Sequence, residues 1–322
     1  DTLFENIKAM TKDGLSVIFI SHKLREVLTF SNRIAVLRHG EKVGEIATSD
    51  ANEKVIARMM VGEDTIENPR DKIKLGNPIL ELHEISLIGD SARTSLNSSN
   101  LTIHQHEIVG IAGVSGKGQS VLAKLISGLI EPDSGTLNIN GENIKYFSPN
   151  EMQSLGVGRI PEDRHHDGVI GAMSVAENLI IERLNDKDIN SRGFLQNKEI
   201  NENAKQLIEK YDIRGPGVDA KASLLSGGNI QKLILARVFE CRPIVILANQ
   251  PTRGLDLGAA NEVARRLLKA RARGAGILLI SEDLDEIIAL SDRIIVIHNG
   301  SLTEAHNADR EAIGLMMAGE SA

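Results

Sequence analysis

The residues best placed to do chemistry in this sequence lie in a glycine-rich segment, GVSGKGQS at 113–120, between an apolar strand-like run and an apolar helical pattern. Glycines let backbone N–H groups wrap phosphate oxygens, and the start of the following helix adds partial positive charge. The pattern predicts a phosphate-binding loop, whereas a tight glycine turn without a ligand is the alternative for the motif taken alone. The residues expected to contact nucleotide here are Gly113, Gly116, Lys117, Gly118, Gln119, Ser120 and Val121.

The lysine that such a loop normally carries is absent. In the pattern G-x-x-x-x-G-K-[ST], the lysine reaches the β- and γ-phosphates and the hydroxyl holds Mg²⁺. Ser120 supplies the hydroxyl, which predicts weak Mg²⁺ binding, but Gln119 occupies the lysine position. Lys117 lies two positions earlier, and we expect the loop to aim it elsewhere. The positive charge that normally meets the transferable phosphate is therefore missing.

Two amides follow a second apolar run, at the place where nucleotide-hydrolysing proteins with this loop carry carboxylates. PIVILANQPTRGLDLGA (243–259) puts Asn249 and Gln250 at the end of the run, and the next turn contains Asp256. Amides keep the shape of carboxylates, but they neither coordinate Mg²⁺ through charge nor act as a general base. ISEDLDE (280–286) places Glu282 after a third run, and GRIPEDR (158–164) places Glu162 after a fourth.

A serine and two glycines open a further helical pattern, ASLLSGGNIQKLILARV at 222–238. We expect Ser226 to cap this helix, while Gly227 and Gly228 let the helix start approach a γ-phosphate closely. Leu225 completes the segment. A capped amphipathic helix without a ligand is the simpler alternative.

A run of possible metal ligands, His165, His166 and Asp167, follows Glu162. Adjacent residues on a loop seldom converge on one ion. We therefore expect a solvated loop here rather than a metal site.

A sheet is needed to bring these segments together. The runs at 107–113, 243–248, 276–281 and 293–298 are apolar and strand-like, and helical patterns alternate with them. This alternation predicts an α/β fold with a mainly parallel core sheet. The stretch from ILELHEISL to TLNINGENI alternates polar and apolar residues and contains turn residues, which predicts an additional small antiparallel sheet.

The C-terminal part of the sequence repeats an earlier part. GLSVIFISHKLREVLTFSNRIAVLRHG (14–40) aligns with GAGILLISEDLDEIIALSDRIIVIHNG (274–300) at a constant offset of 260, and ARMMVGE (57–63) matches GLMMAGE (314–320) after a slip of three. A period this long indicates duplicated domains. We expect a C-terminal remnant of a first domain at 1–63, a polar linker at 64–78 and a complete second domain at 79–322. The alignment places His22 opposite Glu282.

The composition argues against several classes of function. The formal net charge of −7 argues against nucleic-acid binding, which depends on clustered Lys and Arg. Cys241 is the only cysteine, which excludes an internal disulfide and fits a reducing compartment. The apolar runs are far shorter than the roughly 20 residues of a membrane-spanning helix, so any membrane role is expected to be peripheral.

Taken in order, the motifs resemble those of the tandem ATP-binding subunits of simple-sugar and nucleoside ABC importers, above all the nucleoside branch associated with basic-membrane-protein lipoproteins. The specific segments are PEDR (161–164), SGGN-x-QK (226–232), QPTRGLD (250–256) and SEDLDE (281–286). The resemblance covers 79–322 fully and 1–63 partly. The chain is therefore identified as an N-terminally truncated member of that family.

The resemblance implies the fold of an ABC cassette of the P-loop NTPase class, with a helical subdomain at about 163–230. It implies ATP and Mg²⁺ as cofactors, and a peripheral place on the cytoplasmic face of the cell membrane. The implied partners are two permease subunits, a periplasmic or lipoprotein substrate-binding protein and the missing first cassette of the same chain. The further residues it places at nucleotide are Glu162, Leu225, Ser226, Gly227, Gly228, Asn249 and Asp256.

Cassettes of this family pair head to tail, so the 225–228 segment would serve the ATP of the first cassette, with His22 as the switch histidine of that cassette. The second cassette's own site would be degenerate, because Gln119, Asn249, Gln250 and Glu282 replace its polar contributors to phosphoryl transfer. This chain alone is then expected to be inactive. Two alternatives stay open: a soluble twin-cassette ATPase, and a nucleotide-binding module without catalysis.

Overall fold

The computed structural model of the chain describes residues 2–21, 24–38, 41–61, 71–89, 95–114, 116–306 and 309–319. The chain divides into two compact units. The first contains residues 1–69 and 254–262, and the second contains residues 70–253 and 263–322. The domain boundaries proposed from the sequence, at 63/64 and 78/79, stay a prediction.

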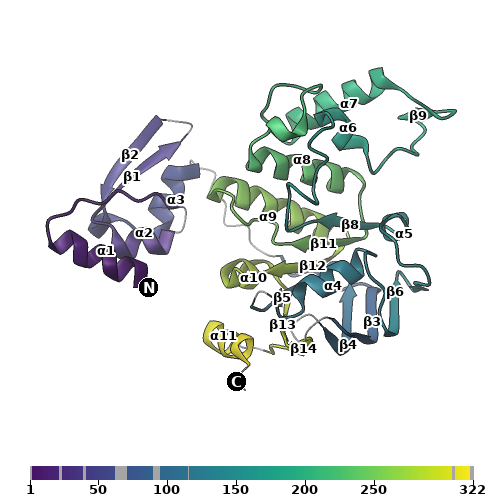
Figure 1. Cartoon of the computed structure of the whole chain (residues 1–322), viewed down its shortest axis with the longest axis horizontal. Coiled ribbons are helices and arrows are strands. Elements are labelled where there is room, and N and C mark those ends of the chain that lie inside the picture. The colour runs from purple at the N-terminus through teal and green to yellow at the C-terminus, as the bar shows by residue number, and fades with distance from the viewer. Residues whose placement is uncertain are drawn as a thin grey trace. The chain divides into compact units, whose positions relative to one another are not determined.

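The first unit is a small α/β body (Figure 1). Its core contains Ile34, Val36 and Ile56, with partly buried apolar side chains of α2 and α3 packed against them. The strands β1 and β2 form an antiparallel pair. The elements of 2–61 are α1 (Thr2–Lys12), α2 (Leu24–Phe30), β1 (Arg33–Arg38), β2 (Glu41–Ala47), η1 (Thr48–Asp50) and α3 (Glu53–Val61).

The repeat seen in the sequence is also a repeat of structure. The elements α2, β1 and β2 start 260 positions before α10 (Leu284–Leu290), β13 (Arg293–His298) and β14 (Ser301–Glu304), and α3 precedes α11 (Arg310–Ala318) by 257. One element differs. Residues 15–21 lie outside any strand, with Ile18 and Ile20 96% and 95% exposed, whereas their counterparts form the buried strand β12 (Gly276–Ser281).

The core sheet of the second unit has the order β14-β13-β5-β12-β11-β8. All its neighbouring strands are parallel except β13 and β14. The remaining strands are β5 (Ile108–Ala112), β8 (Val157–Ile160) and β11 (Val245–Asn249). Their near-continuous apolar runs suit strands that are covered on both faces. The mainly parallel core sheet predicted from the sequence is confirmed.

A four-stranded antiparallel sheet lies beside this core sheet, with the order β4-β3-β6-β7. Its strands are β3 (Pro78–Leu87), β4 (Leu96–His104), β6 (Ser134–Ile139) and β7 (Glu142–Asn143). The helix α4 (Gln119–Ile126) packs in one hydrophobic core with both sheets, through Leu122, Leu125 and Ile126 (Figure 1). The small antiparallel sheet is therefore confirmed as well.

Three helices form an arm on the other side of the core sheet, at the top of Figure 1. They are α6 (Val175–Ile180), α7 (Asn197–Lys210) and α8 (Gly227–Glu240), with the short hairpin β9 (Asn190–Ser191) and β10 (Phe194–Leu195) between the first two. A capping box between Ser174 and Glu177 fixes the start of α6. The other elements are α5 (Pro149–Ser154), η2 (Ala222–Leu224) and α9 (Leu257–Ala272).

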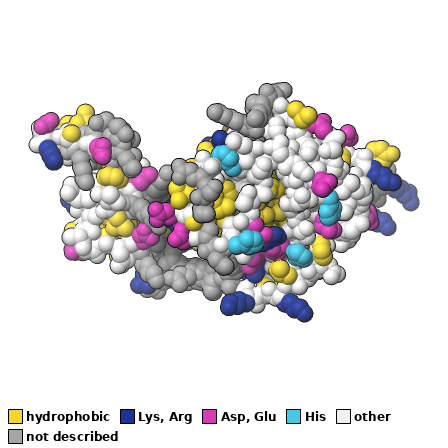
Figure 2. Space-filling view, turned by 90° about the horizontal axis from the view of Figure 1, so that it is seen from below, with side chains coloured by type: hydrophobic (Ala, Val, Ile, Leu, Met, Phe, Trp, Pro, Cys, Tyr) yellow, Lys and Arg dark blue, Asp and Glu magenta, His cyan; other side chains and the backbone are white. Residues whose placement is uncertain are grey.

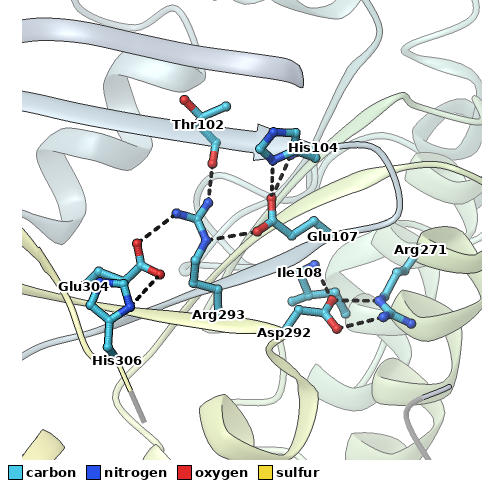
Figure 3. Close-up of polar contacts among 9 residues, drawn as sticks. All are labelled: Thr102, His104, Glu107, Ile108, Arg271, Asp292, Arg293, Glu304 and His306. Atoms are coloured by element: carbon cyan, nitrogen blue, oxygen red, sulfur yellow. Dashed lines mark hydrogen bonds and ion pairs between the residues drawn. The ribbon is translucent and has the colours of Figure 1, made fainter. Parts of the chain in front are cut away.

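Ion pairs join the two sheets at the end where β4 finishes and β5 starts (Figure 3). The buried carboxylate of Glu107 accepts from Nε of Arg293 at 3.0 Å and from the backbone N–H of His104 at 2.8 Å. Arg293 also donates to the carbonyl oxygen of Thr102 and to Glu304. Figure 2, seen from below, shows histidine, acidic and basic side chains gathered on this side. The network therefore connects β4, β5, β13 and β14.

A second ion pair fixes the end of α9 beside the same strands. The buried guanidinium of Arg271 donates two hydrogen bonds of 2.7 Å to the carboxylate of Asp292. That carboxylate also accepts from the backbone N–H of Ile108 at 2.9 Å (Figure 3). Bidentate pairing of this kind gives strong geometric definition. The start of β5, and hence the loop at its other end, is anchored to α9 and β13.

Candidate functional site

Parallel register brings four of the predicted site segments to one edge of the core sheet. Ala112 of β5 lies opposite Ser281 of β12, and Ile280 lies opposite Asn249 of β11. Ala248 in turn lies opposite Ile160 of β8. The residues that follow these strand ends therefore leave from the same edge, which is where open α/β sheets bind ligands. They are Gly113, Glu282, Gln250 and Glu162, and Asn249 is the last residue of β11 at the same edge.

The glycine loop has the shape that its sequence requires. Gly118 has φ +114° and stands directly before α4, a backbone conformation that favours glycine. A Cβ on Gly113 would lie 2.7 Å from the side chain of Ile297, so only glycine allows this close approach. The hydroxyl-bearing Ser120 is exposed in the first turn of α4, and Val121 is buried. The loop thus positions backbone N–H groups before a helix start.

The two side chains nearest to the lysine position are both engaged inside the protein. Gln119 is 5% exposed, and its Nε2 donates to the carbonyl oxygen of Gly113 at 3.1 Å. Nζ of Lys117 donates to Oδ1 of Asn299, in the turn between β13 and β14, at 3.1 Å. Gly116 is exposed. The lysine position of the loop therefore holds the neutral amide of Gln119. The nearby cation, Lys117, is bound at the β13–β14 turn.

The amides that replace the carboxylates are held by the neighbouring strand. The backbone N–H of Gln250 donates to the carbonyl oxygen of Ile280 at 2.8 Å, and its Oε1 accepts from the backbone N–H of Glu282 at 3.2 Å. Gln250 has φ +51°, which is uncommon for a residue with a side chain and typical of functional sites. Asn249 is half-buried at the end of β11, and the side chain of Glu282 is exposed.

Sequence reasoning missed a buried carboxyl behind this edge, that of Glu286 in α10. Both its oxygens are buried and neither makes a hydrogen bond of good geometry. Burial is the main cause that raises the pKa of Glu286, and Asp283 raises it further, while the hydroxyls of Ser281 and Thr252 lie close enough to oppose the shift. The sequence repeat pointed to this residue, because it aligns Glu286 with Glu26 and Ser281 with Ser21. In the first unit, Ser21 donates to Glu26 at 2.9 Å.

Glu162 forms an ion pair rather than standing free at the edge. Its Oε1 accepts from Arg253 at 2.6 Å, and Arg164 donates to the carbonyl oxygen of Arg253 at 2.9 Å. These contacts join the segment after β8 to the turn after β11. Sequence reasoning assigned no role to Arg253 or Arg164.

The histidine-rich loop is arranged by a neighbouring aspartate. Oδ1 of Asp163 accepts the backbone N–H groups of His165 and His166, and these bonds are the main cause that lowers its pKa. The hydrogen bond between the His166 ring and the accepting carboxylate of Asp167 raises the pKa of His166. Among the residues that the structure describes, no three His, Cys, Asp or Glu side chains are grouped to hold a metal ion.

The start of α8 differs from the expectation in one respect. Ser226 stands at the N-cap position, but its side chain makes no capping hydrogen bond, so the predicted cap is wrong. Its hydroxyl instead accepts from Nδ2 of Asn229 at 2.9 Å, because Asn229 is held by the backbone N–H of Arg214. Leu225 is buried, and the space around Gly228 is open. The hydroxyl is thereby oriented by a neighbour rather than used by the helix.

A buried glutamine links this helix to the turn after β11. Nε2 of Gln231 donates to the carbonyl oxygen of Pro251 at 2.8 Å. Gly227 lies beside the guanidinium of Arg164, with 3.5 Å between an added Cβ and Nε. Asp256 accepts from the backbone N–H of Ala259 at 2.8 Å, at the start of α9. His22 lies outside the described residues.

These residues fit part of Mg-ATP. The glycine loop, Ser120 and the start of α4 suit the α- and β-phosphates. The metal and the third phosphate need carboxylate ligands and a cation, but Asn249, Gln250 and Gln119 are neutral and Lys117 is engaged with Asn299. The described residues of this edge therefore do not fit the metal and the third phosphate that hydrolysis needs.

Comparison with known proteins agrees with the architecture. Residues 96–253 match the family described as ABC transporter. A glucose import ATP-binding protein of Haloferax volcanii is 42% identical over 325 residues, which cover 99% of this chain and 59% of that protein. A nucleoside import ATP-binding protein of Lactococcus lactis is 36% identical over 327 residues, with coverages of 98% and 63%. The chain thus spans about three fifths of the length of these relatives.

Solved structures show the same fold. A cassette dimer in a post-hydrolysis state with ADP and phosphate superimposes with a TM-score of 0.60 at 23% identity, covering 72% of this chain and 100% of its own. A nucleotide-free cassette from an ABC transporter gives 0.57 at 24% identity, with coverages of 75% and 96%. The fold class predicted from the motifs is confirmed.

Proposed function

We propose that this chain belongs to the ATP-binding subunit of an ABC importer for nucleosides or simple sugars, because residues 96–253 match the ABC transporter family and solved cassettes share its fold. In this proposal the second cassette donates the start of α8 to a nucleotide site of a first cassette. Its own site does not turn nucleotide over. Residues 1–63 are then the C-terminal part of that first cassette.

One contrast within the second unit carries the proposal. The 225–228 segment is complete, and Ser226 is exposed, with an oriented hydroxyl and open space at Gly228. The edge at Gly113 has lost its cation and its carboxylates. A helix start built for phosphate is useful beside a degraded site only if it serves nucleotide held elsewhere. The repeat in 1–63 is evidence for a first cassette, which would hold the nucleotide that the start of α8 contacts.

The relatives support the type of cargo. Their names describe import of glucose, nucleosides, guanosine and ribose. We propose nucleosides before simple sugars, because PEDR, SGGN-x-QK and SEDLDE resemble the nucleoside branch.

The proposed partners are those of an importer. They are two permease subunits, a periplasmic or lipoprotein substrate-binding protein and the first cassette, with the subunit bound to the cytoplasmic face of the membrane. In the described part of the chain, no helix is long and apolar enough to span a bilayer.

The test compares two substitutions in the full-length subunit reconstituted with its permeases. Ser226→Arg places a bulky cation at the donated helix start and removes the serine hydroxyl. We expect the ATPase rate to fall about 100-fold or more, because loss of one preorganised donor near developing charge has an effect of that size. Gln250→Ala touches only the degraded site, so turnover should stay within a few-fold. If Gln250→Ala abolishes turnover while Ser226→Arg spares it, the two roles have been assigned backwards.

A further inference from the structure

We infer that the glycine loop of the second unit binds a nucleoside diphosphate in preference to the triphosphate, and binds it without a divalent metal. This inference rests on the proposed function, because it takes the loop as a nucleotide site. It names the ligand class of the site that does no chemistry.

The loop keeps what two phosphates need. Gln119 donates one N–H to the carbonyl oxygen of Gly113 and so fixes the loop from inside. A side-chain amide nitrogen carries two hydrogens, which leaves a neutral donor beside the backbone N–H groups at Gly118 and the start of α4. Two phosphates can therefore be held by backbone dipoles and one neutral amide.

The position of a third phosphate is unfavourable. Glu282 follows β12 one residue beyond the pair of Ser281 with Ala112, and Gly113 follows β5 one residue beyond the same pair. Its side chain is exposed, and its backbone N–H is already bound to Oε1 of Gln250. Like charges a few ångströms apart near a protein surface reduce affinity on the order of tenfold or more. Glu282 thus disfavours the added charge of a γ-phosphate.

Among the residues that the structure describes, the two cations of this edge are engaged away from that carboxylate. Lys117, the basic residue within the loop, donates to Asn299. Arg253, at the same sheet edge, is paired with Glu162 at 2.6 Å. The groups that would relieve the repulsion are therefore both engaged with other partners.

At this edge, the described positions after β11 that would hold a divalent metal carry no carboxylate. Magnesium is normally held by one or two carboxylates together with phosphate oxygens. Asn249 and Gln250 are neutral, and Oε1 of Gln250 is used by the backbone of Glu282. Oδ1 of Asp283 accepts from the backbone of α10. Diphosphate binding is therefore independent of Mg²⁺.

Isothermal titration of the whole 322-residue chain tests this, with ADP and with ATP, each in Mg²⁺ and in EDTA. We expect ADP to bind about tenfold or more tightly than ATP, and its affinity to be unchanged by EDTA. Glu282→Gln should bring the two affinities together, mainly by strengthening ATP binding. Glu142→Gln is the matched control, because Glu142 is an exposed glutamate on β7, and it should leave the ratio unchanged.

Three results would overturn the inference: ATP binding as tightly as ADP, a ratio that Glu282→Gln leaves unaltered, or no binding of either nucleotide. In the last case the loop is a structural turn. The proposed function would still stand or fall by the effect of Ser226→Arg on turnover of the full-length subunit. Far-ultraviolet circular dichroism of each variant confirms that it is folded.

Discussion

At the scale of single residues, the substitutions in the degraded site have acquired structural roles. Gln119 holds the loop through Gly113, and Gln250 holds the segment after β12 through Glu282. The sequence predicted which positions had changed, because motif spacing fixes them. It could not predict these contacts, since the direction of a side chain depends on how the folded segments pack against one another.

The first prediction concerns activity. The whole chain should show negligible steady-state phosphate release with Mg-ATP. The reason is that the glycine loop lacks its lysine, and amides replace both carboxylates at the end of β11. Gln119→Lys alone should not restore turnover, since Asn249 and Gln250 stay neutral. Turnover typical of transport ATPases, lost on replacing Gly118 or Ser120, would contradict the assignment.

The second prediction concerns Glu286. Its folded-state pKa is raised, so folding favours the protonated carboxyl, and stability is lost as pH rises from near the ordinary value of 4.5 through the folded pKa. Glu286→Gln stays neutral and should raise the free energy of unfolding at pH 7 by roughly 1–3 kcal/mol, the usual cost of an unsatisfied buried polar group. The gain should shrink to nothing below the ordinary pKa.

Urea unfolding from pH 4 to pH 8 measures this effect, with Glu142→Gln as the exposed control. A variant that is destabilised at pH 7 would show that the carboxylate has a partner worth more than its burial costs.

At the scale of elements, apolar runs predicted the strands of the core sheet, because a parallel strand covered on both faces must be apolar throughout. The same rule fails at 15–21. VIFI at 17–20 is as apolar as ILLI at 277–280, yet only the second run has strands on both sides. Strand formation depends on partners as well as on composition, and a single segment does not reveal its partners.

The third prediction follows from that contrast. Amide hydrogens of 15–21 should exchange much faster than those of 276–281, because the first segment lies outside any strand and the second is central in a sheet. Mass spectrometry of the intact chain, read on matched peptides from the two copies, measures the difference. Equal protection in the two segments would show that 15–21 is paired in solution.

At the scale of the whole molecule, the repeat predicted two units of unequal completeness, and each unit has a core of its own. What the sequence could not predict is the polar network that joins the sheets of the second unit. Glu107 and Arg293 are 186 positions apart, and charged residues at such separations carry no periodic signal. Only the structure shows that these two side chains meet.

The last prediction uses that network to separate the two units. Glu107 is buried and accepts from both Arg293 and the backbone of His104, so Glu107→Ala leaves a partly buried guanidinium and an N–H without their carboxylate. Removing one partner of a buried pair typically costs about 3–5 kcal/mol. Hydrogen exchange should therefore show lost protection across β5, β12 and β13, with β1 and β2 unchanged, because their core contains none of these residues. Glu304→Gln is the matched control, since Glu304 is more exposed and leaves Arg293 paired with Glu107, and its effect should be much smaller. Equal loss in both units after Glu107→Ala would mean that they unfold as one cooperative body.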